Sequence, residues 1–254
     1  MTLSNAAFLF LAGLAGGTAN GIAGGGTFFV FPALLFTGVP AVPANATNSV
    51  ALWPGLAASA RAFWPRLNTP RPLLVALMIT GLLGGLAGAV LLIRTPAHIF
   101  VRIMPWLMLT ATVLFALGGR IGAGHAEDSA LEGSRLRIAL AILGEFLLAI
   151  YGGYFGGGIG ILLLALFGAL GMTNIHQMNA LKITLVTIIN GVAMVAFVAA
   201  RTLYWPQTLV IVVAAIVGGH YGAHLSQRLP AAWVRAFVLL VGTGATIYFF
   251  VRAA

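Results

Sequence analysis

Residues 23–32 read Ala23-Gly24-Gly25-Gly26-Thr27-Phe28-Phe29-Val30-Phe31-Pro32, three glycines followed at once by an apolar run. A second triplet stands in residues 154–161, Tyr154-Phe155-Gly156-Gly157-Gly158-Ile159-Gly160-Ile161. A glycine in the interior of a helix destabilises it by ~1 kcal/mol relative to alanine. Each triplet therefore predicts a break between two helices inside hydrophobic sequence, although a tight turn between two short helices is the simpler alternative.

The amino-acid composition indicates whether the chain folds in water or in a lipid bilayer. Of its 254 residues, 61% are hydrophobic and 7% are charged, whereas a soluble domain carries about 25% charged residues. Apolar runs of bilayer-spanning length, ~17–25 residues, recur along the chain. These features predict an all-α polytopic membrane protein, with the lipid bilayer as a partner. Residues 1–5 contain no Lys or Arg, so we expect the first apolar run to be a retained helix rather than a cleaved signal peptide.

The absence of cysteine and the distribution of the basic residues exclude several classes of function. The chain has no cysteine, which excludes disulfides, thiolate metal sites and cysteine catalysis. Its formal net charge of +9 is carried by basic residues scattered near segment ends. That pattern is typical of anchoring at a membrane interface and not of nucleic-acid binding. We predict no cofactor and no metal; homo-oligomerisation stays open.

Ten apolar segments, some short or broken, can be drawn. They lie near residues 6–23, 27–42, 45–63, 72–93, 99–118, 136–153, 156–170, 175–200, 204–224 and 231–251. The long polar interval is 119–137, which contains Glu127, Asp128 and Glu132 and is predicted to be a surface linker. It divides the chain into a first membrane repeat, residues 1–118, and a second membrane repeat, residues 138–254.

The two halves follow the same order of features after each glycine triplet. In the first half, Thr37-Gly38-Val39-Pro40 precedes Asn45-Ala46-Thr47-Asn48. In the second half, Leu170-Gly171-Met172-Thr173 precedes Asn179-Ala180-Leu181-Lys182. Because five segments is an odd number, two such halves would insert with opposite orientations. Inverted repeats with broken helices near the midplane are a recurring architecture of secondary transporters, so we expect both triplets near the midplane, close to each other and to a polar cavity.

These motifs resemble the TauE/SafE sulfite-exporter family. The resemblance rests on residues 20–26 (Asn20-Gly21-Ile22-Ala23-Gly24-Gly25-Gly26), Pro32, Gly38-Val39-Pro40 and Ala46-Thr47-Asn48, and on the matching second-half motifs with Asn190. It covers nearly the whole chain and implies a multi-pass permease of the cytoplasmic membrane for sulfite, sulfonates or related small anions. The second half departs from the first in having no proline matching Pro32, and in having Lys182 where the first half has Asn48 or Ser49.

Lys182 is the strongest candidate for the substrate site. It is the only lysine and lies in the first turns of a long apolar segment, where its charge would add to that of a helix N-terminus and attract anions. The alternative is a lysine whose ammonium group reaches the membrane interface. Val186 and Asn190 follow at spacings of four, on the same helical face. The predicted substrate-binding residues are Gly24, Gly25, Gly26, Asn45, Thr47, Asn48, Gly156, Gly157, Gly158, Asn179, Lys182 and Asn190.

Glu145 is the only acidic residue outside the polar linker. A buried ionisable group in a membrane segment is a functional candidate, so Glu145 is either a proton-coupling carboxylate or a structural partner of a neighbouring donor. His220 and His224 lie four apart, but without a carboxylate they are read as an interfacial pair rather than a metal site. The chain has only four acidic residues, so it offers few side chains for hydrolytic catalysis. We predict a secondary transporter and not an enzyme; an anion channel and an intramembrane enzyme that uses Ser and His are the alternatives.

The arginines predict the orientation in the membrane. With ten crossings, one side holds eight arginines and the other side holds four, and the richer side is expected to be cytoplasmic. Both termini would then lie outside, whereas an eight-crossing arrangement with two re-entrant segments would invert them. The richer side holds Arg61, Arg66, Arg71, Arg120, Arg135, Arg137, Arg228 and Arg235; the other holds Arg94, Arg102, Arg201 and Arg252.

Overall fold

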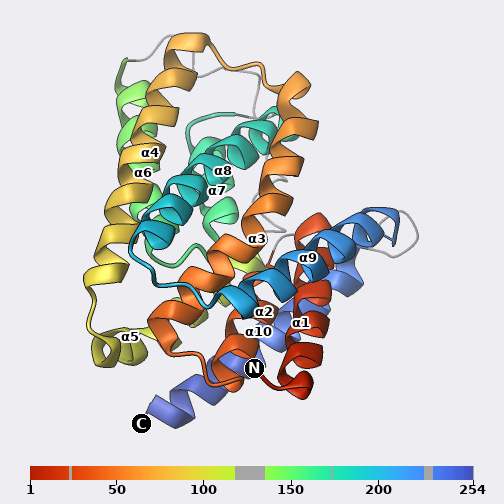
Figure 1. The fold of residues 1–254 in the computed structure, drawn as a ribbon. Helices are drawn as coiled ribbons and strands as arrows, with labels where there is room; N and C mark the ends of the chain where they lie inside the picture. The colour runs from red at the N-terminus through yellow and green to blue at the C-terminus, as the bar shows by residue number, and fades with distance from the viewer. Residues whose placement is uncertain (23–24, 118–134, 173, 226–230, 254) are drawn as a thin grey trace.

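The computed structural model describes residues 1–22, 25–117, 135–172, 174–225 and 231–253. These residues form ten α-helices and one short 3₁₀ helix, η1, and contain no strand (Figure 1). The predicted all-α fold is confirmed. The helices are α1 (Leu3–Ile22), α2 (Thr27–Phe36), α3 (Ala41–Phe63), α4 (Arg71–Arg94), α5 (Ala97–Leu117), α6 (Arg135–Tyr154), α7 (Ile159–Ala169), α8 (Ile175–Ala199), α9 (Trp205–Leu225) and α10 (Ala231–Ala253), with η1 (Trp64–Arg66) after α3.

Two boundaries differ from the sequence prediction for local reasons. The second segment ends at Phe36 rather than 42, because Gly38 takes a positive φ of 86° and the N–H of Val39 donates back to the carbonyl of Leu34. The next helix therefore starts early, at Ala41. Residues 135–137, which were assigned to the polar linker, belong to α6 instead, and linker residues 119–134 lie outside the described residues.

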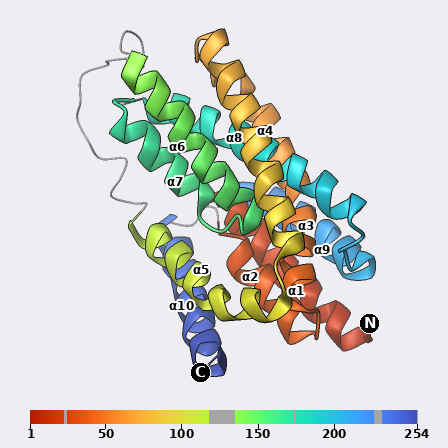
Figure 2. The same ribbon diagram turned by 90° about the vertical axis from the view of Figure 1, so that its left-hand side faces the viewer.

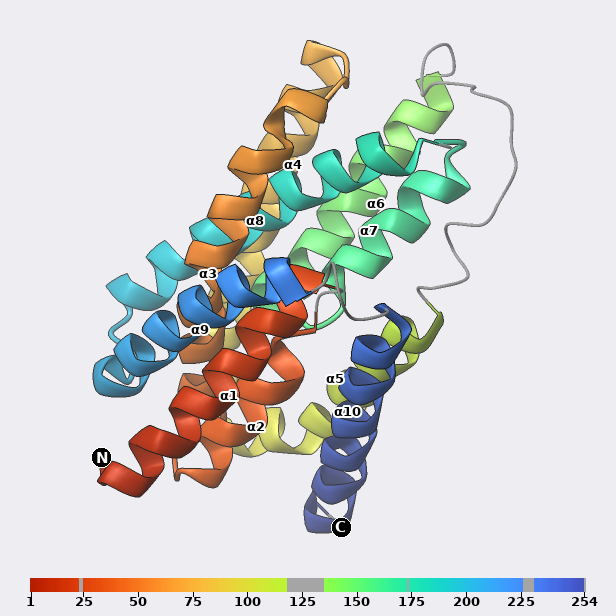
Figure 3. The ribbon, with the colours of Figure 1, turned by 90° about the vertical axis from the view of Figure 1, so that its right-hand side faces the viewer.

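Each half contributes a helical hairpin. The hairpins are α1–α2 and α6–α7, and Figure 3 shows their tips approaching each other near the centre of the molecule from opposite ends. Gly25 and Gly158 lie in these tips with φ values of 93° and 77°, a left-handed conformation that side chains destabilise by ~1–2 kcal/mol. The ten residues of α2 and the eleven of α7 rise only about 15–17 Å. Neither can cross a ~30 Å hydrocarbon core alone.

The helices exchange partners between the halves. The first helix of each half packs along the fourth helix of the other half, as α1 on α9 and α4 on α6. The third helices contact each other, α3 on α8, and the fifth helices do the same, α5 on α10. This reciprocal pairing is what a two-fold relation between the repeats requires. It also means that neither repeat builds a core of its own.

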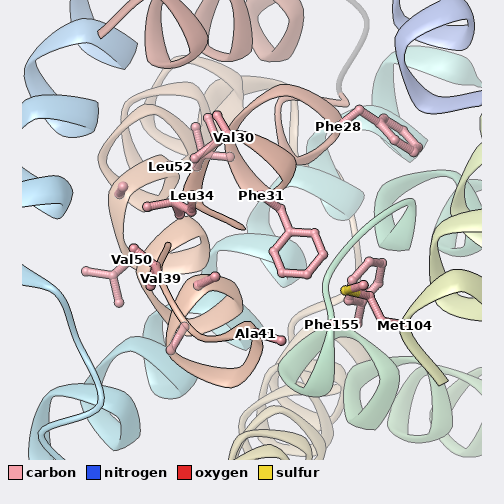
Figure 4. Close-up of a cluster of buried hydrophobic side chains, with 14 of the residues drawn as sticks. Phe28, Val30, Phe31, Leu34, Val39, Ala41, Val50, Leu52, Met104 and Phe155 are labelled. Carbon is pink, nitrogen blue, oxygen red and sulfur yellow. The ribbon is translucent and has the colours of Figure 1, made fainter. Parts of the chain in front are cut away.

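The buried cores are likewise shared. The larger hydrophobic cluster joins residues of both halves, and Figure 4 shows Phe31 of α2 facing Phe155 and Met104. The rings of Phe31 and Phe155 meet edge to face, with centroids 5.8 Å apart. Many large apolar side chains are exposed on the surface of the molecule; the exposed fraction of Leu240, for example, is 70%. Such a surface suits lipid, since soluble monomers rarely expose large apolar patches.

Four helices within the described residues, α4, α5, α6 and α8, are long and apolar enough to cross a membrane. Figure 2 shows the α3–α4 connection and the start of α6 at one end of the molecule, with both termini and the α4–α5 connection at the other. The first end carries Arg66, Arg71 and Arg135, and the second carries Arg94. These four arginines therefore lie at two opposite ends of the molecule, and which end faces the cytoplasm stays a prediction.

Candidate functional site

The two hairpin tips open into one cavity of about 580 Å³. Its walls come from the end of α1, the segment 155–158 that follows α6, the starts of α2 and α7, and one face each of α3 and α8, with Phe115 of α5. Residues far apart in the two halves therefore meet at one place. Of the predicted site residues, the cavity is lined by Gly25, Asn48, Gly156, Gly157, Gly158, Asn179, Lys182 and Asn190.

Lys182 reaches this cavity as a cation with a neutral partner. Its Nζ donates to Oδ1 of Asn179 at 2.7 Å, and Nδ2 of Asn179 donates to the carbonyl of Ile175 at 2.9 Å. The second hydrogen bond orients the amide so that its oxygen faces the lysine. Glu145, the only acidic side chain among the described residues, binds Thr80 instead. Two of the three ammonium hydrogens are left for a ligand.

The helix N-terminus that lies beside Lys182 is not that of its own helix. Lys182 is seven residues beyond the start of α8, about 10 Å along the axis, and the helix dipole acts only within the first turn. The aliphatic part of Lys182 lies instead over Gly160, in the first turn of α7, where a Cβ would stand 3.3 Å from Cδ of the lysine. The sequence prediction that Lys182 lies at the N-terminus of its own helix is therefore wrong, and the helix whose first turn lies beside the lysine stem is α7, the short helix after the second glycine triplet.

Amide side chains also line the cavity. Asn190 donates to the carbonyl of Val186 at 2.9 Å, and its Oδ1 lies 3.6 Å from where a Cβ would stand on Gly156. Asn48 donates one amide hydrogen to Oγ1 of Thr27 at 3.3 Å, and its Oδ1 is buried without a hydrogen bond. Each amide therefore keeps one N–H that a ligand can use. Cation, helix N-terminus and amides together form a site suited to an oxyanion.

Four of the predicted residues are not in the cavity or cannot be placed there. The side chains of Asn45 and Thr47 are used within the fold: Asn45 donates to the carbonyl of Tyr154 at 2.8 Å, and Thr47 accepts from the N–H of Tyr204 at 3.2 Å. The N–H of Gly26 donates to Oδ1 of Asn20 at 2.8 Å, and Gly26 does not line the cavity. Gly24 lies outside the described residues.

The cavity also contains polar residues that the sequence analysis did not select. Asn20, Thr27, Ser49 and Ser59 line it. Ser59 lies on the stripe of α3 that runs from Asn48 through Leu52 and Leu56 at spacings of four, four and three, so helical periodicity from Asn48 would have found it. Ser49 is the residue next to Asn48 and lies three before Leu52. Asn20 lies one turn before the first glycine triplet. Only the folded structure shows that its Oδ1 accepts a hydrogen bond from the N–H of Gly26 at the tip of the α1–α2 hairpin.

Glu145 lies away from this cavity, in the contact between α4 and α6. Its side chain is fully buried, Oε2 accepts from Oγ1 of Thr80, and Oε1 has no hydrogen bond. A Cβ on Gly81 would stand 2.7 Å from that Oε1, so the glycine makes room for the carboxyl group. The structure therefore separates the coupling candidate from the substrate candidates.

Comparisons with known proteins point to one class. The family described as sulfite exporter TauE/SafE matches residues 9–249. A probable membrane transporter protein of Haemophilus influenzae is 26% identical over 236 residues, which cover 92% of this chain and 90% of its own. A probable membrane transporter protein of Escherichia coli, YfcA, is 25% identical over 237 residues, which cover 92% of this chain and 85% of its own. No solved structure shows a significant match.

Proposed function

Because the chain belongs to the TauE/SafE sulfite-exporter family of membrane transporters, we propose that it is a secondary transporter of small anions, sulfite or sulfonates, in the cytoplasmic membrane. The observation that carries the proposal is Lys182, a cation without an acidic partner among the described residues, in a cavity between the two hairpin tips. Lys182 is half-buried, and an anionic ligand would supply the opposite charge that favours the ammonium form of a lysine.

The position of the site also supports a transporter. The cavity lies where two hairpins from the two halves meet, with glycines at both tips. Carriers that alternate between two openings place their site between such repeats and rock one repeat against the other. We assign binding to Lys182, Asn48 and Asn190 and to the backbone of residues 156–158; Asn45 and Thr47 hold the surrounding helices together.

Flux measurements in proteoliposomes test this function. Sulfite and methanesulfonate are offered on one side, and uptake is followed with and without a pH or sodium gradient. We expect saturable uptake that a gradient drives and that Lys182→Met reduces. Single-channel currents would assign the protein to the anion channels instead, and the absence of protein-dependent flux of either anion would contradict the proposal.

A further inference from the structure

The apolar wall of the cavity suggests more about the ligand than its charge. Eleven of the 24 lining residues are apolar or aromatic, eight are polar and five are glycine. We propose that the substrate is an organic monoanion whose acidic head is carried on an apolar body of several carbon atoms. This inference rests on the proposed function, because it concerns the same cavity.

The size of the cavity exceeds what a bare inorganic oxyanion fills. Its 580 Å³ falls within the ~300–1,000 Å³ typical of sites for organic ligands. An ion of four heavy atoms displaces roughly two water molecules, about 60 Å³ at ~30 Å³ each. Sulfite at Lys182 would leave most of the space unfilled, against an apolar wall.

The apolar side chains begin directly beside the cation. Ile183 and Val186 flank Lys182 on α8, and Leu164 faces the cavity from α7. On α3, Leu52 and Leu56 follow Asn48 at spacings of four, and Leu56 is about 12 Å from Asn48 along the helix. A head group at Lys182 would therefore have its body among leucine, isoleucine and valine side chains, where burial of carbon is favourable.

The charge of the site selects a single negative charge. Among the described residues, Lys182 is the only charged side chain that lines the cavity, and Glu145 lies elsewhere. A divalent anion would keep one charge uncompensated in a region of low dielectric, which is costly. The amides of Asn48 and Asn190 can orient an ionised head but cannot neutralise a second charge.

A homologous series of ligands tests the proposal. The purified full-length protein in nanodiscs is titrated calorimetrically with sulfite, with linear alkanesulfonates of one to five carbons and with the matching carboxylates. Each buried methylene should tighten binding by about fourfold, and sulfonates and carboxylates should show the same slope. The corresponding alcohols, which partition into the bilayer without a charge, should give no saturable binding.

Two leucines of α7 provide a matched pair of variants. Leu164→Ala removes carbon from the cavity wall, whereas Leu166→Ala truncates a neighbouring leucine that packs against the same core cluster and does not line the cavity. Leu164→Ala should flatten the chain-length dependence. Leu166→Ala should keep the wild-type slope.

The outcomes separate this inference from the function on which it rests. If the wild type binds sulfite and methanesulfonate but longer chains do not bind more tightly, the inference of an apolar body is wrong and the proposed anion site still stands. Failure of every anion in the series to bind would overturn both. A slope that Leu166→Ala removes as fully as Leu164→Ala would also count against the cavity wall.

Discussion

Lys182 is the residue on which the proposed anion site depends. An anion there gains charge-assisted hydrogen bonds of ~1.5–3 kcal/mol each, so Lys182→Met should weaken binding at least tenfold, since ~1.4 kcal/mol is one decade. Lys182→Arg should weaken it less if charge dominates. Calorimetric affinities for methanesulfonate measure both variants. The control is Arg102→Met, which removes an exposed charge of α5 and should bind normally. If Lys182→Met binds with wild-type affinity, Lys182 does not contact the anion and its role is structural.

Asn179 tests whether Lys182 must stay without an acidic partner. The 2.7 Å hydrogen bond between these side chains would become an ion pair in Asn179→Asp, and the new carboxylate would compete with the substrate for the ammonium group. We expect a loss of affinity close to that of Lys182→Met. The control is Asn174→Asp, the same change at the exposed N-cap of α8, which should bind normally. Unchanged affinity in Asn179→Asp would argue against a contact between ligand and Lys182.

Glu145 is the residue for which two roles remain. If it couples protons, Glu145→Gln should abolish flux driven by a pH gradient while the protein stays folded, because an amide keeps the shape and loses the titratable group. Flux in proteoliposomes with and without the gradient measures this. Thr80→Val removes the donor that holds Oε2 and should impair the same flux partially. Unchanged gradient-driven flux in Glu145→Gln would assign the residue to the packing of α4 on α6.

At the scale of elements, glycine permits close contacts between helices, and the contact of α4 with α6 is one of them. A Cβ on Gly153 of α6 would overlap the carbonyl oxygen of Gly85 on α4, whereas a Cβ on Gly55 of α3 would meet nothing within 4 Å. Overpacking destabilises by ~1–3 kcal/mol. Gly153→Ala should therefore lower the thermal midpoint of the purified protein by several degrees. Gly55→Ala should leave it equal or higher, and equal midpoints for the two variants would contradict this contact.

The sequence predicted the elements better than the site. Long apolar runs locate the helices, and the paired glycine triplets predict the two breaks. The chain pattern cannot show which helix N-terminus lies beside Lys182, because Gly160 comes near it only through the packing of α7 on α8. For the same reason Asn45 and Thr47 looked like ligand residues, although long-range contacts with Tyr154 and Tyr204 use their side chains.

At the scale of the whole molecule, the hairpins simplify the orientation in the membrane. A hairpin returns the chain to the side from which it came, so the connections have the same sidedness whether α1–α2 and α6–α7 cross fully or only enter. The chain has no cysteine, which allows single cysteines to be introduced at exposed Ser4 and Asn68. We expect Ser4→Cys to react with a membrane-impermeant thiol reagent on intact cells and Asn68→Cys to react only after lysis. The reverse pattern would invert the predicted topology.

The pairing of α1 with α9 has a consequence for how the protein is made. Thr18 donates a hydrogen bond to the carbonyl of Gly218 at 2.9 Å, 200 residues along the chain. A ribosome adding about 5–20 residues per second therefore leaves α1 without its main partner for at least ~10 seconds after its own synthesis. During that interval the nascent chain exposes a glycine-lined helix face to lipid and to other newly inserted helices.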